Sequence, residues 1–190
     1  HNNSMRANIR INELTRVVIV GAGLGGLQLA MHLRKAGFQV VIVDKNNYNQ
    51  FPPLIYQVAS AGLEPSSISF PLRRIFQGYK NYFFRMAEVR EIDVKEKAIR
   101  TSVGTIHYNY LVLAMGATTN FFGNEDVERH ALPMKTVEDA MALRNHVLLA
   151  LERAETEENA EKRQKFMNFV IVGGGPSGVE IAGALAEMKK

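Results

Sequence analysis

The first regular pattern of hydrophobic positions runs over residues 15–37 and predicts a strand, a tight turn and a helix. Val17 to Val20 form a continuous apolar run, which is typical of a parallel strand covered on both faces. Helically spaced leucines and a methionine follow, and Gly37 then ends the helix. A second apolar run over residues 38–46 completes a strand–helix–strand unit of about 30 residues with a right-handed crossover.

The pattern changes in the middle of the chain. Residues 47–80 place prolines among apolar positions, so we expect a loop with short helical pieces, of a kind that often lines a ligand site. Residues 82–113 alternate like antiparallel strands, with turn chemistry near Lys95–Glu96 and at Gly104. This alternation predicts a small meander whose last, apolar strand, starting at Tyr110, returns to the main sheet.

The last third of the chain contains two further patterns. Residues 136–155 predict an amphipathic helix with Thr136 as its N-cap, and the dense charges of residues 152–165 indicate a solvated helix end and linker. Residues 168–190 then repeat the order of strand, glycine loop and helix. The sequence therefore predicts an α/β fold: a Rossmann-like domain of parallel sheet plus antiparallel meander, then the first βα unit of a second Rossmann-like domain.

Composition narrows the range of functions. The chain has 46% apolar and 22% charged residues, as an ordinary globular domain does, and it lacks cysteine, which excludes disulfides, thiolate metal sites and cysteine nucleophiles. The histidines have no ligand spacing, so no metal is expected. The net charge of +4 comes from a basic first half, but no basic–aromatic interleaving supports nucleic-acid binding.

A glycine-rich segment between the first strand and helix carries the clearest chemistry. It matches G-x-G-x-x-G at Gly21, Gly23 and Gly26, where the glycines permit a tight turn, close approach of a pyrophosphate, and close helix–strand packing. The helix N-terminus favours phosphate through its N–H groups and dipole. Asp44 ends the second strand, where a carboxylate can accept both hydroxyls of an adenosine ribose. The alternative is a glycine-rich turn between ordinary elements, which this context disfavours.

A second glycine segment has the same pattern at Gly173, Gly175 and Gly178, again after apolar residues and before a helix. Two dinucleotide loops in one chain indicate two dinucleotides, and hydride transfer between a nicotinamide and a flavin is the chemical reason to pair them. Glu180 is expected in the first turn of the last helix. It could complement the helix dipole or face the nicotinamide, and the sequence leaves both roles open.

Together these segments resemble the type II (alternative) NADH dehydrogenases, single-subunit flavoproteins that pass electrons from NADH to quinone without pumping protons. The resemblance covers nearly all of residues 15–190. Its most specific parts are the segments FPPLIYQVASAGLEPSSISFPLR (51–73) and YNYLVLAMGATTNFFGN (108–124). Pro52 and Met115 depart from the family pattern, which places hydrogen-bonding residues at both positions.

The resemblance implies a role for each matching residue. Tyr56, Gln57 and Glu180 are implied as catalytic residues, with Glu180 near the nicotinamide–flavin contact and the other two towards the quinone. The residues implied to bind the cofactors are Gly21, Ala22, Gly23, Gly25, Gly26, Asp44, Lys45, Pro53, Ala114, Gly116 and Ala117 for FAD, and Gly173, Gly175 and Gly178 for NADH. From the pattern alone, residues 114–117 could equally be a strand end followed by a turn.

The resemblance also implies a domain organisation. Residues 1–14 are expected to be a tag remnant, with the natural start at Met5, and an N-terminal tail. Residues 15–150 would form an FAD-binding domain that lacks a returning segment, residues 151–166 a charged linker, and residues 167–190 the truncated start of an NAD(P)H-binding domain. The strand of that last unit is expected to pair with a neighbouring chain, to pack on the FAD domain, or to be poorly ordered.

Three functions remain open at this stage. The first is an NADH dehydrogenase (quinone) that is cytoplasmic and peripheral on the inner face of the plasma membrane, attached through a missing C-terminal region, with a homodimer allowed. The second is an NAD(P)H-dependent ferredoxin- or rubredoxin-type reductase, which residues 51–73 disfavour. In the third, the chain as given is a catalytically inert nucleotide-binding fragment. Disulfide reductases are disfavoured because the chain has no cysteine.

Overall fold

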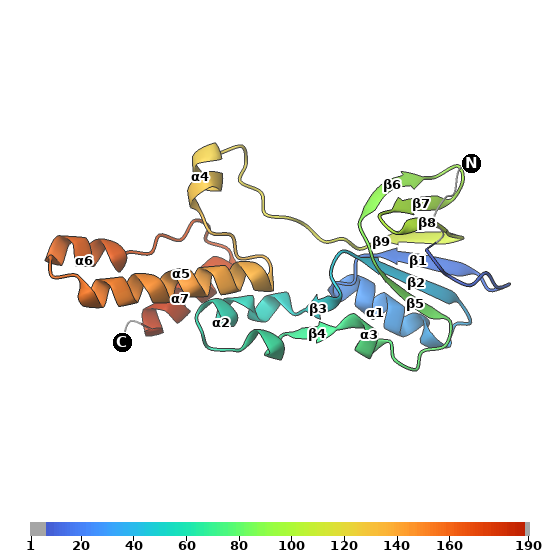
Figure 1. Ribbon diagram of the computed structural model, residues 1–190, viewed down its shortest axis with the longest axis horizontal. Coiled ribbons are helices and arrows are strands. Elements are labelled where there is room, and N and C mark those ends of the chain that lie inside the picture. The colour runs from blue at the N-terminus through green and yellow to red at the C-terminus, as the bar shows by residue number, and fades with distance from the viewer. Residues whose placement is uncertain (1–6, 189–190) are drawn as a thin grey trace. The chain divides into compact units, whose positions relative to one another are not determined.

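The computed structural model describes residues 7–188, and Figure 1 shows its ribbon. The expected tag remnant and Met5 lie outside the described residues. The chain divides into two compact units. Of the described residues, the first unit contains 7–49 and 70–117, and the second contains 50–69 and 118–188.

A four-stranded parallel sheet forms the centre of the first unit, in the order β5-β2-β1-β9. Its strands are β1 (Arg16–Val20), β2 (Gln39–Asp44), β5 (Tyr82–Met86) and β9 (Tyr110–Leu113). Val17 of β1 lies in register with Val40 of β2 and with Tyr110 of β9. The central position of β1 confirms the prediction of a parallel strand covered on both faces, and β9 returns to the main sheet as expected.

The two faces of this sheet are buried by different elements. Val17 and Ile19 pack in a core with residues of α3, and Val18 and Val20 pack in a second core that includes Ile99 and Ile106. The helices of this unit are α1 (Leu24–His32), continued by the 3-10 turn η1 (Leu33–Lys35), and α3 (Leu72–Ile75). Because successive side chains of a strand point to opposite faces, one apolar run fills both cores.

The predicted meander forms, but it is shorter than expected. It is an antiparallel sheet of β6 (Val89–Asp93), β7 (Ala98–Thr101) and β8 (Gly104–His107). The first turn includes Lys95 and Glu96 as expected, and the second lies at residues 102–103, directly before Gly104. Residues 82–86 were predicted to belong to it and instead form the parallel edge strand β5. The reason is packing, because Phe84 of β5 is buried in the helix-side core of the parallel sheet.

The second unit is mainly helical. Its longest helix, α5 (Val137–Thr156), begins at the predicted N-cap Thr136, whose hydroxyl accepts from the N–H of Asp139 while the Asp139 carboxylate accepts from the N–H of Thr136. Its other helical elements are η2 (Pro52–Leu54), α2 (Ile55–Ala59), η3 (Pro65–Ser67), α4 (Glu125–His130), α6 (Ala160–Phe166) and α7 (Pro176–Met188). A separate two-stranded sheet consists of β3 (Tyr48–Gln50) and β4 (Ser69–Pro71). Residues 47–80 thus contain the expected short helical pieces.

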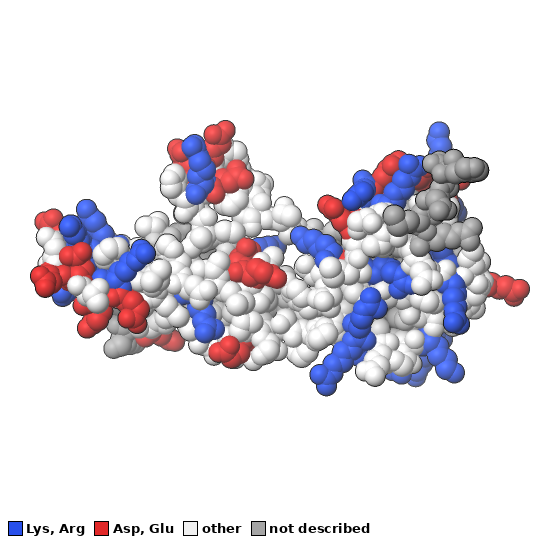
Figure 2. Space-filling view, viewed as in Figure 1, with Lys and Arg blue, Asp and Glu red and all other residues white. Residues whose placement is uncertain are grey.

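Two expectations about the last third of the chain need correction. The charged residues 152–165 contain the end of α5 at Thr156, as expected, but most of the predicted linker is helical because α6 begins at Ala160. Lys, Arg, Asp and Glu gather over α6 in the space-filling view (Figure 2). Residues 169–172 form no strand, and the side chains of Val170 and Val172 are 88% and 74% exposed. A strand needs a partner for its backbone hydrogen bonds, and no strand within residues 7–188 pairs with this segment.

The last helix, α7, is held by apolar packing, and sheet pairing plays no part in this. Ile181 and Leu185 of α7 lie in a core with Ile55 and Val58 of α2 and Ala140 of α5. The packing is made by α7 and by none of residues 169–172, so the expectation that a strand here packs on the FAD domain stays a prediction.

Candidate dinucleotide-binding loops

The first glycine loop connects β1 to α1 at the carboxyl end of the central strand. Gly21 has a φ of +99°, and a Cβ atom there would lie 2.3 Å from the carbonyl oxygen of Ala114, which follows β9. A Cβ atom at Gly26 would lie 1.9 Å from the carbonyl oxygen of Gly21. Both positions therefore require glycine, because real Cβ atoms do not approach backbone this closely.

The glycines between these two positions are open, in the sense that a side chain added there would meet no other atom. Gly23 and Gly25 are exposed, and a Cβ atom at either would have no neighbour within 4 Å. Gly23 is the N-cap residue of α1, and the first N–H groups of a helix have no partners within the helix. The loop thus has two buried glycines that shape it and an open N-terminal turn that a pyrophosphate can approach. The chain fits a dinucleotide here.

Asp44 lies beside this loop, as the sequence predicts. Its Oδ2 accepts from the N–H of Ala22 at 2.6 Å, and its Oδ1 accepts from the N–H of Asn46 at 2.8 Å. The carboxylate is therefore anchored by two backbone groups at the end of β2. Each oxygen can accept a further hydrogen bond, so ribose hydroxyls could still be bound.

The structure also brings Ala114 to the loop, since a Cβ atom at Gly26 would lie 3.3 Å from the Ala114 methyl group. Ala114 donates its N–H to the carbonyl oxygen of Val20 at 2.7 Å. Lys45, Gly116 and Ala117 are exposed. One buried polar residue at the loop has no signal in the sequence pattern: the Asn49 side-chain amide donates to the carbonyl oxygen of Ala22 at 2.7 Å.

The second glycine loop reproduces the local geometry of the first. Gly173 has a φ of +116°, and a Cβ atom at Gly178 would lie 2.1 Å from the carbonyl oxygen of Gly173. The N–H of Val179 bonds to the carbonyl oxygen of Gly175 at 3.1 Å, as that of Leu27 bonds to Gly23 at 2.9 Å. The turn of a dinucleotide loop is therefore present although the preceding residues form no strand.

The three residues implied as catalytic lie in the second unit, as does Pro53, which is exposed. Tyr56 and Gln57 are neighbours on α2, and the Gln57 amide donates to the Tyr56 hydroxyl at 3.0 Å. Glu180 is exposed and lies in the second turn of α7, because that helix begins at Pro176. The prediction that Glu180 lies in the first turn is wrong. The interaction of a carboxylate with the helix dipole falls off beyond the first turn, so the structure gives no support to a dipole-capping role for Glu180.

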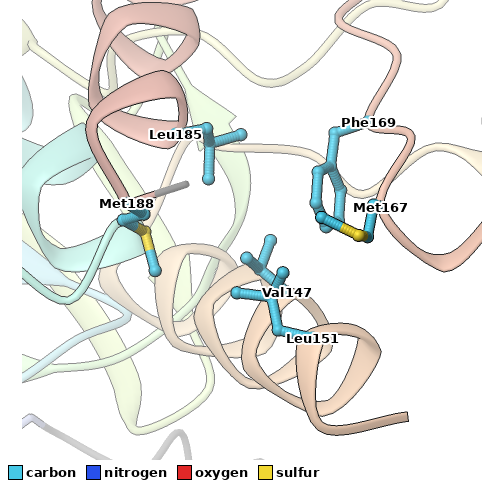
Figure 3. Close-up of a pocket in the computed structure, with 6 residues that line it drawn as sticks. All are labelled: Val147, Leu151, Met167, Phe169, Leu185 and Met188. Atoms are coloured by element: carbon cyan, nitrogen blue, oxygen red, sulfur yellow. The ribbon is translucent and has the colours of Figure 1, made fainter. Parts of the chain in front are cut away.

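A small cavity in the second unit contains none of the predicted site residues. It has a volume of about 20 Å³ and lies between α5, residues 167–169 and α7 (Figure 3). Its lining is apolar: Val147, Leu151, Met167, Phe169, Leu185 and Met188. This volume has room for about one water molecule, so the cavity is a packing defect and no nucleotide site. Within residues 7–188 no group of three or more His, Cys, Asp or Glu side chains could hold a metal ion.

The first unit has a parallel sheet, a glycine loop after β1 and the carboxylate of Asp44 at the end of β2. This combination defines a dinucleotide-binding protein. The chain belongs to the pyridine nucleotide-disulphide oxidoreductase family, whose family model matches residues 15–190.

Relatives and solved structures agree with the resemblance found in the sequence. The chain is 37% identical over 177 residues to the type II NADH:quinone oxidoreductase NdhA of Mycobacterium tuberculosis, covering 91% of this chain and 38% of that protein. It is 34% identical over 182 residues to the external alternative NAD(P)H-ubiquinone oxidoreductase B4 of Arabidopsis thaliana, a mitochondrial protein, covering 90% and 31%. The structure of NDH2 from Plasmodium falciparum in complex with NADH matches with a TM-score of 0.82 at 27% identity, covering 92% and 37%.

The predicted resemblance to type II NADH dehydrogenases is thereby confirmed. The chain spans less than two fifths of the length of these relatives. No helix within residues 7–188 has the length and apolar character needed to cross a membrane.

Proposed function

We propose that this chain supplies the dinucleotide-binding part of a flavin-dependent NADH:quinone oxidoreductase. The observation that carries the proposal is the first glycine loop, in which Gly21 and Gly26 are buried and shape the turn while Gly23 and Gly25 remain open. FAD would lie with its pyrophosphate on the N-terminal turn of α1 and its adenosine ribose at Asp44. Bound FAD would supply the hydride and electron chemistry between NADH and a quinone.

The second loop extends the proposal to NADH. Gly173 and Gly178 are placed as Gly21 and Gly26 are, so the N-terminal turn of α7 would bind the NADH pyrophosphate. Tyr56, Gln57 and Glu180 would line the paths of quinone and nicotinamide in the whole protein, and these roles stay proposals. Attachment to the inner face of the plasma membrane from the cytoplasm, a homodimer and the domain division at residues 150–167 are proposed on the same resemblance.

A variant at Gly23 tests the FAD site without disturbing the fold. Gly23→Val places a side chain in open space at a φ of −70°, which valine accepts, so the melting temperature of the chain without nucleotide should stay unchanged. The same side chain would occupy the space of the pyrophosphate, and FAD affinity should fall at least about tenfold. Quenching of flavin fluorescence on titration measures that affinity.

The matched control is Gly183→Ala in α7, a glycine that is also open and lies far along the sequence from the first loop. It should bind FAD as the unchanged chain does. Equal FAD affinity of the Gly23→Val variant and the unchanged chain would show that the loop is not the FAD site. Oxidation of NADH belongs to the whole protein, and we expect the 190-residue chain alone to bind FAD without turnover.

A further inference from the structure

Two side chains hold the first glycine loop through consecutive peptide groups of its backbone. The Asp44 carboxylate accepts from the N–H of Ala22 at 2.6 Å, which fixes the peptide group between Gly21 and Ala22. The Asn49 amide donates to the carbonyl oxygen of Ala22 at 2.7 Å, which fixes the next peptide group, between Ala22 and Gly23. Ala22 itself is only 2% exposed, so bulk water does not compete for its N–H or its carbonyl oxygen.

The second of these bonds determines the direction of a group that faces the pyrophosphate site. A peptide group is planar and trans, so its C=O and N–H point in opposite directions. With the Ala22 carbonyl directed at Asn49, the N–H of Gly23 points away from Asn49. Gly23 is exposed and caps α1, and its N–H is therefore available at the open helix N-terminus.

The chemistry of Asn49 suits this task. The side chain is 7% exposed. Buried polar side chains in folded proteins are nearly always hydrogen-bonded, and the Asn49 amide has the Ala22 carbonyl oxygen as its partner. Only a donor can hold a carbonyl oxygen, so aspartate, which has the same shape, would place a carboxylate oxygen against the Ala22 carbonyl. That contact would be repulsive, and the peptide group would be free to rotate.

We propose that Asn49 is a positioning residue for dinucleotide binding: by holding the Ala22 carbonyl, it aims the Gly23 N–H at the pyrophosphate of the bound nucleotide. The inference rests on the proposed function, because it assigns a residue to the same FAD site. The inference gives the two side chains that hold the loop different roles. Asn49 orients a donor for the pyrophosphate, and Asp44 lies where the adenosine ribose would bind.

The test compares ligands with and without a pyrophosphate. Binding of FAD, ADP and adenosine is measured for the full 190-residue chain and for Asn49→Asp and Asn49→Leu, with Asn47→Asp as the control. Asn47 is exposed and two residues away, so its variant adds the same charge outside the loop. Asn49→Asp should weaken FAD and ADP about tenfold and adenosine less than about twofold, with Asn49→Leu intermediate and Asn47→Asp unchanged.

Equal weakening of ADP and adenosine would assign Asn49 a merely structural role and overturn the inference. Wild-type affinity of Asn49→Asp for ADP would overturn it as well, while FAD binding that depends on Gly23 would leave the proposed function standing. If the unchanged chain binds no FAD, both proposals fail together.

A measurement on the unchanged chain covers the case in which the Asn49 variants do not fold. The backbone amide resonance of Gly23 is followed by NMR in glycine-labelled protein. Saturating ADP should shift it much more than saturating adenosine does, because only ADP brings a phosphate to that N–H. Equal shifts with the two ligands would overturn the inference.

Discussion

A Cβ atom at Gly26 would lie 1.9 Å from the carbonyl oxygen of Gly21, five residues earlier in the chain. This relationship fixes the entry of α1 against the turn that follows β1. The same relationship recurs between Gly178 and Gly173 at 2.1 Å. Gly25 and Gly175, which lie near these two closed positions, would each have no neighbour within 4 Å of a Cβ atom.

Gly26→Ala should destabilise the first unit even without nucleotide. The added methyl group would collide with backbone, and overpacking of this kind costs about 1–3 kcal/mol. Gly25→Ala, one residue away, meets nothing within 4 Å and should leave stability unchanged or raise it by about 0.5–1 kcal/mol, as alanine does in a helix. Urea unfolding followed by circular dichroism measures both, and equal stability of the two variants would contradict the packing argument.

Gly178→Ala should have the corresponding effect on the start of α7. The methyl group would lie 2.1 Å from the carbonyl oxygen of Gly173, so the loop must open. We expect a loss of about 1–3 kcal/mol and lower amide protection in the first turn of α7. Hydrogen exchange of residues 173–181 is the measurement, with Gly175→Ala, an open position, as its control. Wild-type protection in the Gly178 variant would count against this packing.

Asp44→Asn should weaken the loop through the Ala22 N–H. An amide offers one acceptor where the carboxylate offers two, so either the N–H of Ala22 or that of Asn46 loses its partner. An unsatisfied buried donor costs about 1–3 kcal/mol. Thermal unfolding without nucleotide should show this loss, whereas Glu187→Gln, an exposed carboxylate on α7, should show none. A similar melting temperature for both variants would rule out the anchoring role.

Tyr82 should make the first unit sensitive to alkali. Burial raises the pKa of its phenol to about 12, with Tyr79 adding to the shift and Arg34 opposing it, and its hydroxyl donates to the carbonyl oxygen of Ala30 at 2.6 Å. Because the folded pKa lies above the unfolded value of 10.0, the contribution to stability is complete below pH 10 and is lost as pH rises towards 12.

The measurement is the melting temperature between pH 9 and 11.5 for the unchanged chain and for Tyr82→Phe. The difference between them should shrink as pH rises, because the variant has no phenol to ionise. Tyr110→Phe is the control, since Tyr110 is 62% exposed. A constant difference across this range would contradict the assignment to Tyr82.

Local patterns predicted most elements correctly, because apolar runs, helical periodicity and capping residues can be recognised within a short stretch of sequence. The apolar run Val17 to Val20 identified the central strand, and Thr136 identified the start of α5. Pairing was harder to predict. The strand at residues 82–86 alternates like an antiparallel strand, and only its long-range contact with β2 makes it parallel.

The same distinction applies to the candidate site. Gly21, Gly26 and Asp44 lie together because their spacing along one βαβ unit determines their positions. Asn49 was missed, because its role depends on a hydrogen bond to a residue 27 positions away and its own segment has no regular pattern. Residues 169–172 were predicted as a strand from their apolar character alone, although a strand also needs a neighbour.

The second loop adopts its turn with no paired strand before it. Its shape is thus encoded within about ten residues, by glycines that tolerate positive φ and close backbone contact. The consequence is that the backbone conformation of this turn is a local property of its glycines and does not depend on a paired strand before it.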